Sequence, residues 1–523
     1  MEAPSSQPAV QPAVTTPPRP WWHVRPRALL CLAVAILAAV PLWCFPYVPL
    51  QDLPTHLSTL RILHDLHNPA FGLDADYRVD LGSTQYVLFY VLGDVLAYFV
   101  SVRAAGLLLA SGYMVGTVMA TYSLLGALGK DQRLSLFVIP CLVNALFILG
   151  FLPFFVGLPL MLTAWTLAIR YRETGRVVFG VLLGVVMTAL FYSHVVPFGV
   201  ALIGIALMAP FRSRQELVRY ALPLIPAGLA VVRWAFFTES GAVVRNVLAS
   251  DGSDVWPLDV SLREFYSIGF DAFRDKSDER YFAIGVTLAI VGTFLGSKSK
   301  PEGTRVARWL WVVPVLCIIG YFRSGGDQGY VAHIRDRYPV LAVFTAIPLL
   351  RFPKNKWIGH GLTASLVVLA GLCVESTYWH FSKFWHEEVG DFETALKQIP
   401  PKQHVAGLIY DSSSEYIQHA PFLHYINYYQ LEKGGVVSFS FSGFPHWPTK
   451  FRDHREPLGW VQAKSGSEWH SELIDVRAQL APYFDYLIVR GSGFDPPDDL
   501  YVRAWEGTGW VVWKRRSAEP HES

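Results

Sequence analysis

Long apolar runs, interrupted by short charged loops, occupy the chain from Arg27 to about Thr377. A helix needs about 20 mostly apolar residues to cross a bilayer. Only 16% of all residues are charged, against about 25% in a soluble domain. The pattern predicts an α-helical polytopic membrane protein with about eleven transmembrane helices, embedded in a lipid bilayer. The expected spans are 27–45, 104–127, 134–150, 152–169, 177–193, 194–210, 218–237, 281–296, 306–322, 338–351 and 357–376.

The two ends of the chain differ from this apolar region. Residues 1–26 are rich in Pro, Ala, Ser and Thr, a composition typical of a disordered segment, here expected on the cytoplasmic side. Residues 378–523 read as a small soluble α/β domain. Its expected helices are 381–398 and 413–431, and its expected strands are 404–410, 436–441, 486–489 and 510–513. The net charge of +2 gives no reason to expect a nucleic-acid partner.

One further apolar stretch, 83–101, decides the topology. If it does not cross the membrane, the short loops rich in Lys and Arg all fall on one side, as the positive-inside rule requires. Gly93 and Asp94 interrupt it, and it is rich in aromatic residues. It is therefore predicted to lie on the outer surface. The transmembrane domain 27–377 then has its N-terminus inside, and the regions outside are 46–102, 238–280, 323–337 and 378–523.

An acid lies at the start of the first outer loop, in the run QDLPTH at residues 51–56. Two interpretations of Asp52 are open. Asp followed closely by Pro is typical of a helix start, where the aspartate caps the first turn. At the membrane surface, Asp52 is also a candidate to accept the proton of an acceptor hydroxyl. If the segment is helical, His56 lies on the same face as Asp52 and is a second catalytic candidate.

Arginines gather in the third outer loop, against the positive-inside bias. Because arginine forks match phosphate oxygens, this loop is predicted to bind the phosphate of a lipid-linked donor. The candidate ligands are Arg323, Arg335, Arg337 and Tyr338. The alternative is that the arginines pair with lipid headgroups, or with Asp327 and Asp336 of the same loop.

Two histidines are weaker candidates for substrate binding. His194 lies at a tight outer turn, where a capped or solvated histidine fits equally well, and His333 lies in the third outer loop. The acidic loop 238–280 lacks the spacing of a calcium-binding EF-hand, and no cysteine pair has the spacing of a zinc site. No metal and no cofactor are therefore predicted, although a divalent cation stays an open alternative.

Three features together resemble the GT-C superfamily of membrane glycosyltransferases, which includes protein O-mannosyltransferases and the lipid A aminoarabinose transferase. They are the acid Asp52, the surface helix expected at 83–101, and the run Arg337-Tyr338-Pro339 that opens a late span. The resemblance covers residues 27–376 as an architecture, and the C-terminal domain by its placement. It implies a GT-C-like fold.

The resemblance also implies an activity. It is the inverting transfer of a sugar from a polyprenyl-phosphate donor to an extracytoplasmic lipid, glycan or protein acceptor. Asp52 would be the general base, and Arg337 with Arg335 would hold the donor phosphate. Many relatives carry a second acid beside the first, whereas Leu53 stands here. Other residues that remain candidates for this role are His56, Asp65, Asp76 and Asp80.

The expected location is the bacterial plasma membrane, with the active site on the extracytoplasmic side. Two other functions fit an outer domain on a helical membrane protein. One is a transporter or flippase of lipid-linked glycans, which needs a polar path through the bilayer. The other is a non-catalytic envelope scaffold, in which Asp52 and the outer arginines need not converge on one site.

Overall fold

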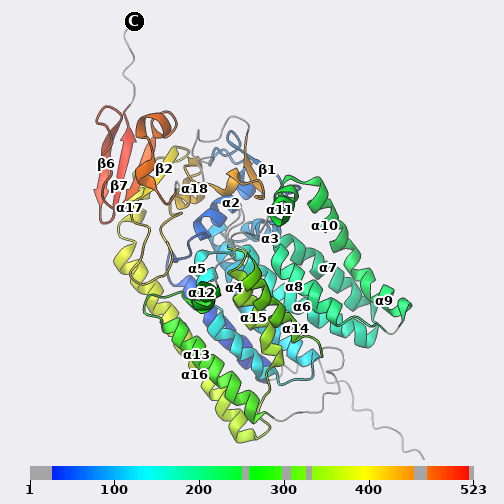
Figure 1. The fold of residues 1–523 in the computed structure, drawn as a ribbon. Helices are drawn as coiled ribbons and strands as arrows, with labels where there is room; N and C mark the ends of the chain where they lie inside the picture. Colours follow the sequence, from blue (N-terminus) through cyan, green and yellow to red (C-terminus); the bar gives the residue numbers. More distant parts are fainter. Residues whose placement is uncertain are drawn as a thin grey trace, which may run out of the picture.

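The computed structural model describes residues 26–211, 213–249, 258–296, 308–324, 333–452 and 468–516. Long helices form a bundle, and a small β-sheet lies at one end of it (Figure 1). The predicted fold class is therefore confirmed: the protein is mostly helical, with several apolar helices and a small C-terminal sheet domain.

Apolar helices make up the bundle. Among the described residues, five helical stretches are long and apolar enough to cross a membrane, and shorter apolar helices accompany them. The chain is an integral membrane protein, although the number of spans stays a prediction. The bundle helices are α1 (Pro26–Ala39), α4 (Val102–Ala127), α6 (Leu152–Thr174), α7 (Val177–Ser193), α8 (Val195–Leu207), α9 (Arg214–Ala221), α10 (Ile225–Phe237), α13 (Ser277–Leu295), α14 (Val312–Arg323), α15 (Arg337–Ala346) and α16 (Lys356–Lys383).

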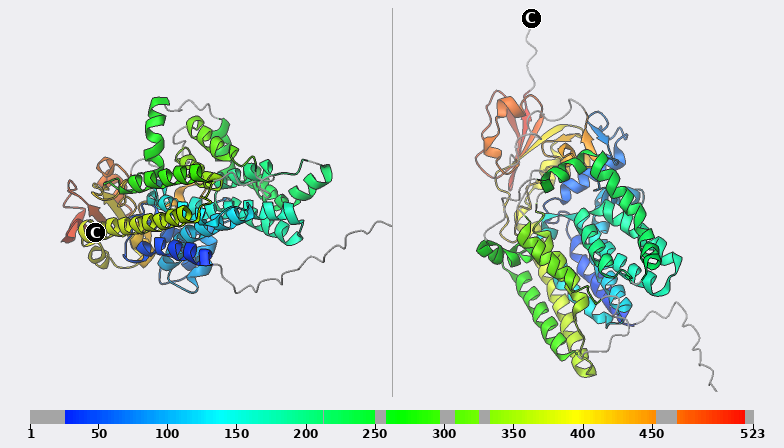
Figure 2. Two further views of the ribbon diagram at one scale, coloured as in Figure 1. Left: turned by 90° about the horizontal axis from the view of Figure 1, so that it is seen from below. Right: turned by 45° about the vertical axis from the view of Figure 1, so that its right-hand side comes forward.

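Two further helices, α11 (Glu239–Ala249) and α12 (Leu258–Phe270), lie in the second outer loop. Helices α13 and α16 pack side by side, as both views of Figure 2 show. Every predicted span except 134–150 coincides with at least one of the bundle helices.

The expected single α-helix over 134–150 is wrong. The structure has a 3₁₀ helix at Gln132–Cys141 and then α5 (Ala145–Leu149). Pro140, which cannot donate a backbone hydrogen bond, lies inside the first helix, and the side chain of Asn144 caps the second. A 3₁₀ helix rises about 2 Å per residue, so the two pieces together still cover roughly 27 Å. This segment therefore connects the end of α4 to the start of α6 without being one α-helix.

The first outer loop contains α2 (Leu53–Asp65), β1 (Tyr77–Val79) and α3 (Leu88–Ala97). Helix α3 falls within the predicted surface helix 83–101. It has 10 residues, or about 15 Å, which is too short to cross a bilayer. Tyr98 and Phe99 at its end are 72% and 81% exposed. These features agree with a helix that lies on the membrane surface.

The C-terminal domain carries a five-stranded sheet in the order β3-β2-β5-β7-β6. Strand β2 is parallel to both β3 and β5, and β7 is antiparallel to both β5 and β6. The strands are β2 (His404–Ile409), β3 (Val436–Val437), β5 (Tyr486–Arg490), β6 (Tyr501–Gly507) and β7 (Trp510–Arg515), and the accompanying helix is α17 (Phe392–Lys397). All four expected strands are present, β3 much shortened, and β6 was not expected.

The expected helix over 413–431 is wrong for most of its length. Only α18 (Asn427–Lys433) is helical; residues 411–420 are irregular, and residues 421–426 form turns. His419 has a φ of 66°, in the left-handed region that ends a helix. Pro421 follows and donates no backbone hydrogen bond. These two residues prevent a continuous helix over 413–431.

A second, two-stranded sheet joins the first outer loop to the C-terminal domain. Strand β1 pairs with β4 (Thr449–Phe451) in antiparallel register, with Tyr77 opposite Phe451. No sequence pattern predicts this pairing, because the two strands have three residues each and lie far apart in the chain. The loop and the domain therefore form one cap over the bundle.

Candidate active site

The first outer loop and the C-terminal domain meet at α2 and α18, which pack against each other. The Ser58 hydroxyl donates to Oδ1 of Asn427 over 3.0 Å, and the backbone N–H of Ala420 donates to Oε1 of Gln51 over 3.2 Å. All these groups are buried. The contact therefore places residues of the C-terminal domain beside Asp52.

Asp52 occupies the N-cap position of α2, but its side chain makes no capping hydrogen bond. Its Oδ1 atom lies 2.9 Å from Nδ1 of His424 instead. Asp52 is 8% exposed and His424 is 4% exposed. The capping interpretation is thus wrong for the side chain. The Asp52 carboxylate is buried at the outer end of the bundle and makes no hydrogen bond to the first turn of α2.

His56 lies one turn further along α2, as the spacing predicted, and both of its ring nitrogens have partners. Nε2 lies 3.0 Å from the carbonyl oxygen of Gly150, which can only accept, so this nitrogen carries the hydrogen. Nδ1 then accepts from the Tyr90 hydroxyl over 2.7 Å. Burial lowers the pKa of His56 to about 4. The neutral ring ties α2 to the turn at Gly150, and its predicted catalytic role stays untested.

The turn at Gly150 packs closely against the backbone of Asp52. Gly150 ends α5 with a φ of 88°, in the region that favours glycine. The backbone N–H of Asp52 donates to the Leu149 carbonyl over 3.1 Å. A Cβ atom on Gly150 would lie 2.8 Å from the backbone nitrogen of Asp52. Two constraints, a left-handed turn and a close approach, therefore require glycine here.

Arg337 packs against the next residue of the same turn. Its guanidinium carbon lies 4.9 Å from the centroid of the Phe151 ring and 6.0 Å from that of Phe154. Arg337 is 8% exposed. Asp52 and Arg337, which are 285 positions apart in the sequence, therefore lie against the consecutive residues Gly150 and Phe151.

The surroundings of Arg337 are rich in neutral aromatic groups. Burial lowers the pKa of His446 to about 4, and the charges of Lys450 and Arg337 act in the same direction. Burial raises the pKa of Tyr86, and the charge of Arg337 opposes this effect. The Arg337 charge is thus close to groups from the first outer loop and from the C-terminal domain.

His194 is a capping histidine. Its Nδ1 accepts from the backbone N–H of Val196 over 3.1 Å at the start of α8. Its Nε2 lies 3.2 Å from the Tyr86 hydroxyl. Of the two interpretations left open by the sequence, the capped one describes this structure. His194 holds Tyr86 beside Arg337, and its predicted contact with substrate stays untested.

The other members of the predicted phosphate-binding set have packing partners that differ from those of Arg337. Arg335 is 3% exposed, its Nε atom lies 3.6 Å from Oδ1 of Asp336, and its guanidinium carbon is 5.3 Å from the Tyr321 ring. Pairing with Asp336 therefore occurs for Arg335, whereas Asp327 lies outside the described residues. Arg323, the last residue of α14, is exposed.

His333 and Tyr338 complete the third outer loop. Nδ1 of His333 lies 2.7 Å from Oδ2 of Asp336, and its ring lies 5.6 Å from that of Phe151. The Tyr338 ring packs on Gly320 of α14, where an added Cβ would meet it at 2.9 Å. Tyr338 is thus a helix-packing residue, and Arg337 alone of this predicted set packs against both Phe151 and Phe154.

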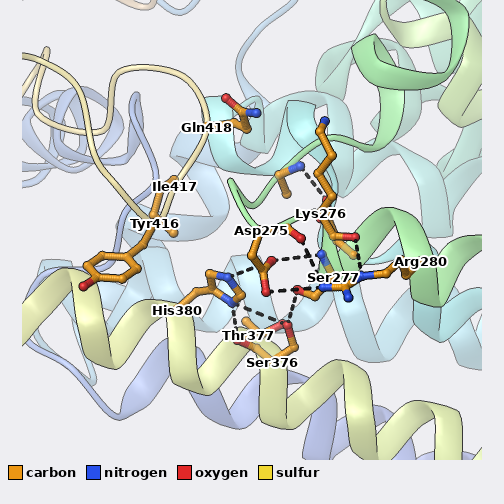
Figure 3. A network of polar contacts seen from close by, with 12 residues as sticks. Asp275, Lys276, Ser277, Arg280, Ser376, Thr377, His380, Tyr416, Ile417 and Gln418 are labelled. Atoms are coloured by element: carbon orange, nitrogen blue, oxygen red, sulfur yellow. Dashed lines mark hydrogen bonds and ion pairs between the residues drawn. The ribbon is translucent and has the colours of Figure 1, made fainter.

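A separate polar network anchors the end of the second outer loop (Figure 3). Nε2 of His380 lies 3.1 Å from Oδ1 of Asp275, and the hydroxyls of Ser277 and Ser376 lie 2.7 Å apart. The His380 ring stacks on Phe273 at 4.0 Å. Within the described residues, no cluster of His, Cys, Asp or Glu has the arrangement of a metal site. We assign the network to joining α13, α16 and the C-terminal domain.

Sequence reasoning missed the residues that the C-terminal domain contributes, above all His424 and His446. His424 lies in an aromatic-rich stretch, and His446 lies in the run FPHWP at 444–448. Neither stretch has a spacing that indicates chemistry. The only available signal was the number of histidines in a domain expected on the same side as Asp52.

No protein-family model and no curated protein matches this sequence. The structure is similar to the crystal structure of ArnT from Cupriavidus metallidurans in the apo state. The TM-score is 0.51 and the identity 11%, over 93% of this chain and 97% of that chain. The apo oligosaccharyltransferase of Archaeoglobus fulgidus aligns with a TM-score of 0.41 and 11% identity, over 90% of this chain and 70% of that chain. The likeness to ArnT confirms the GT-C-like architecture that the sequence predicted.

Proposed function

We propose that this protein is a membrane glycosyltransferase that transfers a sugar from a polyprenyl-phosphate donor to an extracytoplasmic acceptor, with inversion at the sugar carbon. One observation carries the proposal. A buried carboxylate without a capping bond and a buried guanidinium pack against the consecutive residues Gly150 and Phe151. The fold is shared with ArnT, and the site lies under the cap formed by the first outer loop and the C-terminal domain.

The donor end of the site is Arg337. A guanidinium presents parallel N–H groups that match two phosphate oxygens, and it stays charged when buried. The rings of Phe151 and Phe154 pack against it. As the bond between the sugar and the phosphate breaks, negative charge grows on the leaving phosphate, and a fixed positive group stabilises that charge.

The acceptor end is Asp52. In the proposed step, the acceptor hydroxyl gives its proton to the carboxylate, and its oxygen attacks the anomeric carbon of the sugar. The bond from that carbon to the phosphate oxygen breaks, and the phosphate leaves with the electron pair. Attack on the face opposite to the leaving group inverts the configuration. A positioned base of this kind contributes about 100- to 10,000-fold to the rate.

The proposed location follows from the charges and from the sequence. Basic loops are expected in the cytoplasm, which puts Asp52, Arg337 and the C-terminal domain on the extracytoplasmic side. The proposed membrane is the bacterial plasma membrane. A lipid, a glycan or a protein would serve equally as the source of the acceptor hydroxyl.

The test is the binding of a polyprenyl phosphate to the full chain in nanodiscs. We expect Arg337→Ala to weaken binding by about tenfold or more, since a hydrogen bond to a charged group contributes about 1.5–3 kcal/mol. Arg337→Lys keeps the charge but loses the fork, and we expect an intermediate effect.

Arg503→Ala is the matched control, because it removes an exposed arginine of strand β6, outside the site. It should bind like the wild type. Equal binding by all variants, or no binding by the wild type, would remove the support for a lipid-phosphate donor. Such a result would favour the alternative functions, a transporter of lipid-linked glycans or a non-catalytic scaffold.

A further inference from the structure

We infer that His424 is a positioning residue for the proposed base Asp52, so that the C-terminal domain completes the site. This inference rests on the proposed function. Nδ1 of His424 lies 2.9 Å from Oδ1 of Asp52. His424 comes from the C-terminal domain and Asp52 from the first outer loop, and the two residues lie on segments that α2 and α18 bring together.

Aromatic packing, rather than hydrogen bonding, fixes the plane of the His424 ring. The ring stacks on Phe439 with a centroid distance of 4.3 Å and an angle of 7°, and the centroid of the nearly perpendicular Phe441 ring lies 5.6 Å away. Neither ring nitrogen of His424 has a well-aligned hydrogen bond to another described residue. Unsatisfied buried nitrogens destabilise a protein, so a ring held in this way calls for a functional explanation.

The contact with Asp52 supplies that explanation. A carboxylate only accepts hydrogen bonds, so Nδ1 of His424 must carry a hydrogen for the contact to be favourable. The present distance is short but the alignment is poor, as is common at active sites before substrate binds. A small rotation of Asp52 toward an acceptor hydroxyl would align Nδ1–H with Oδ1 and leave the second oxygen for the proton.

The roles of the two residues are not interchangeable. The His424 side chain is 5% exposed and both ring nitrogens are inaccessible, whereas the Asp52 side chain is 12% exposed. Asp52 is therefore the group that an acceptor can reach, and it takes the proton. His424 acts through Asp52 by holding one of its oxygens.

The experiment compares His424→Leu with His424→Asn in the full chain in nanodiscs. Its probes are a synthetic polyprenyl-phosphate hexose and a polyprenyl-phosphate aminopentose, each with a total membrane extract that supplies lipid, glycan and protein acceptor hydroxyls, and released polyprenyl phosphate is measured. We expect His424→Leu to lower kcat by about 100-fold and to leave the binding of polyprenyl phosphate unchanged. His424→Asn should stay within about tenfold of the wild type, because its amide N–H replaces Nδ1–H.

His404→Leu is the matched control. His404 lies in the same domain, stacks on Tyr483 at 4.6 Å and uses Nδ1 in a hydrogen bond to the Tyr483 carbonyl. It is part of the C-terminal sheet, outside the site, and kcat should not change. The double variant Asp52→Asn with His424→Leu should be no slower than Asp52→Asn alone, since His424 acts only through Asp52.

Three results would overturn the inference while the proposed function stands: wild-type kcat in His424→Leu, equal loss in the Leu and Asn variants, or a full additional loss in the double variant. A wild type that releases no polyprenyl phosphate from either probe would instead overturn the proposed function, and the role of His424 with it.

Discussion

Replacing Gly150 by alanine tests whether the close approach of two chain segments places Asp52. Gly150 has a φ of 88°, and a left-handed conformation costs an alanine about 1–2 kcal/mol. Its new Cβ would lie 2.8 Å from the nitrogen and 3.0 Å from the Cβ of Asp52. Because the first of these atoms belongs to the backbone, the chain segment that carries Asp52 must move, which destabilises the protein by about 1–3 kcal/mol more.

The matched control is Gly129→Ala. Gly129 also has a positive φ, of 67°, but an added Cβ would meet nothing within 4 Å. The control therefore carries the backbone penalty without the overlap. The difference between the two variants reports the contact of Gly150 with Asp52.

The assay has two parts, both on full-length protein in detergent or nanodiscs. Thermal unfolding ranks the stabilities, and we expect Gly150→Ala to unfold well below Gly129→Ala. Release of polyprenyl phosphate from a polyprenyl-phosphate sugar measures turnover. A shift of about 1 Å at a reacting group costs about 100-fold, so a shift of a few tenths of an ångström should cost about tenfold. If Gly150→Ala matched Gly129→Ala in both measurements, Gly150 would not position Asp52.

Three further predictions follow from single contacts. Asp52→Asn should lower transfer by about 100-fold or more, yet leave thermal unfolding nearly unchanged, since the side chain caps nothing; a large fall in melting temperature would show that Asp52 chiefly supports the fold. Burial holds the pKa of His56 at about 4 in the folded protein, against 6.5 in the unfolded chain. The unfolded state therefore binds more protons between these two pH values. The free energy of unfolding should fall by up to about 3 kcal/mol as the pH drops from 6.5 toward 4. His56→Gln should reduce this pH dependence of thermal unfolding, while other buried histidines such as His446 keep part of it; an unchanged slope would contradict the assignment. Gly204→Ala places a Cβ 2.3 Å from Nε1 of the buried Trp165 and should destabilise the bundle by about 1–3 kcal/mol. The control Gly199→Ala, on the same helix, places a Cβ that meets nothing within 4 Å, and it should not destabilise the bundle. Equal melting temperatures of the two variants would show that the bundle relaxes around the new methyl group.

The sequence by itself determined the class of the protein and the place of its acid. Apolar runs predicted the bundle because a helix must satisfy its own backbone in lipid. The run QDLPTH predicted a helix start at residue 52 because proline fits the first turn, and α2 begins there. The arginine at 337 was singled out because a basic residue on the outer face needs a local reason.

Two predictions from the sequence are wrong because a segment can be apolar for either of two reasons: it faces lipid, or it is buried in protein. Segment 134–150 is apolar because it is buried among α1, α4, α13 and α16, and a short helix buried in protein looks like one that faces lipid. The stretch 413–431 is rich in aromatic residues because it packs across the end of the bundle. In both cases a proline breaks the helix that composition alone would favour.

Only the tertiary structure decided which residues share the site. Asp52 packs against Gly150 and Arg337 packs against Phe151, and the pairing of β1 with β4 and of α2 with α18 brings in His424. It also gave Arg335 and Tyr338 packing partners that differ from those of Arg337, although the three are close in sequence. The physical reason is that local patterns fix which face of a helix is apolar, whereas contacts between distant segments depend on how the whole bundle and its cap pack together.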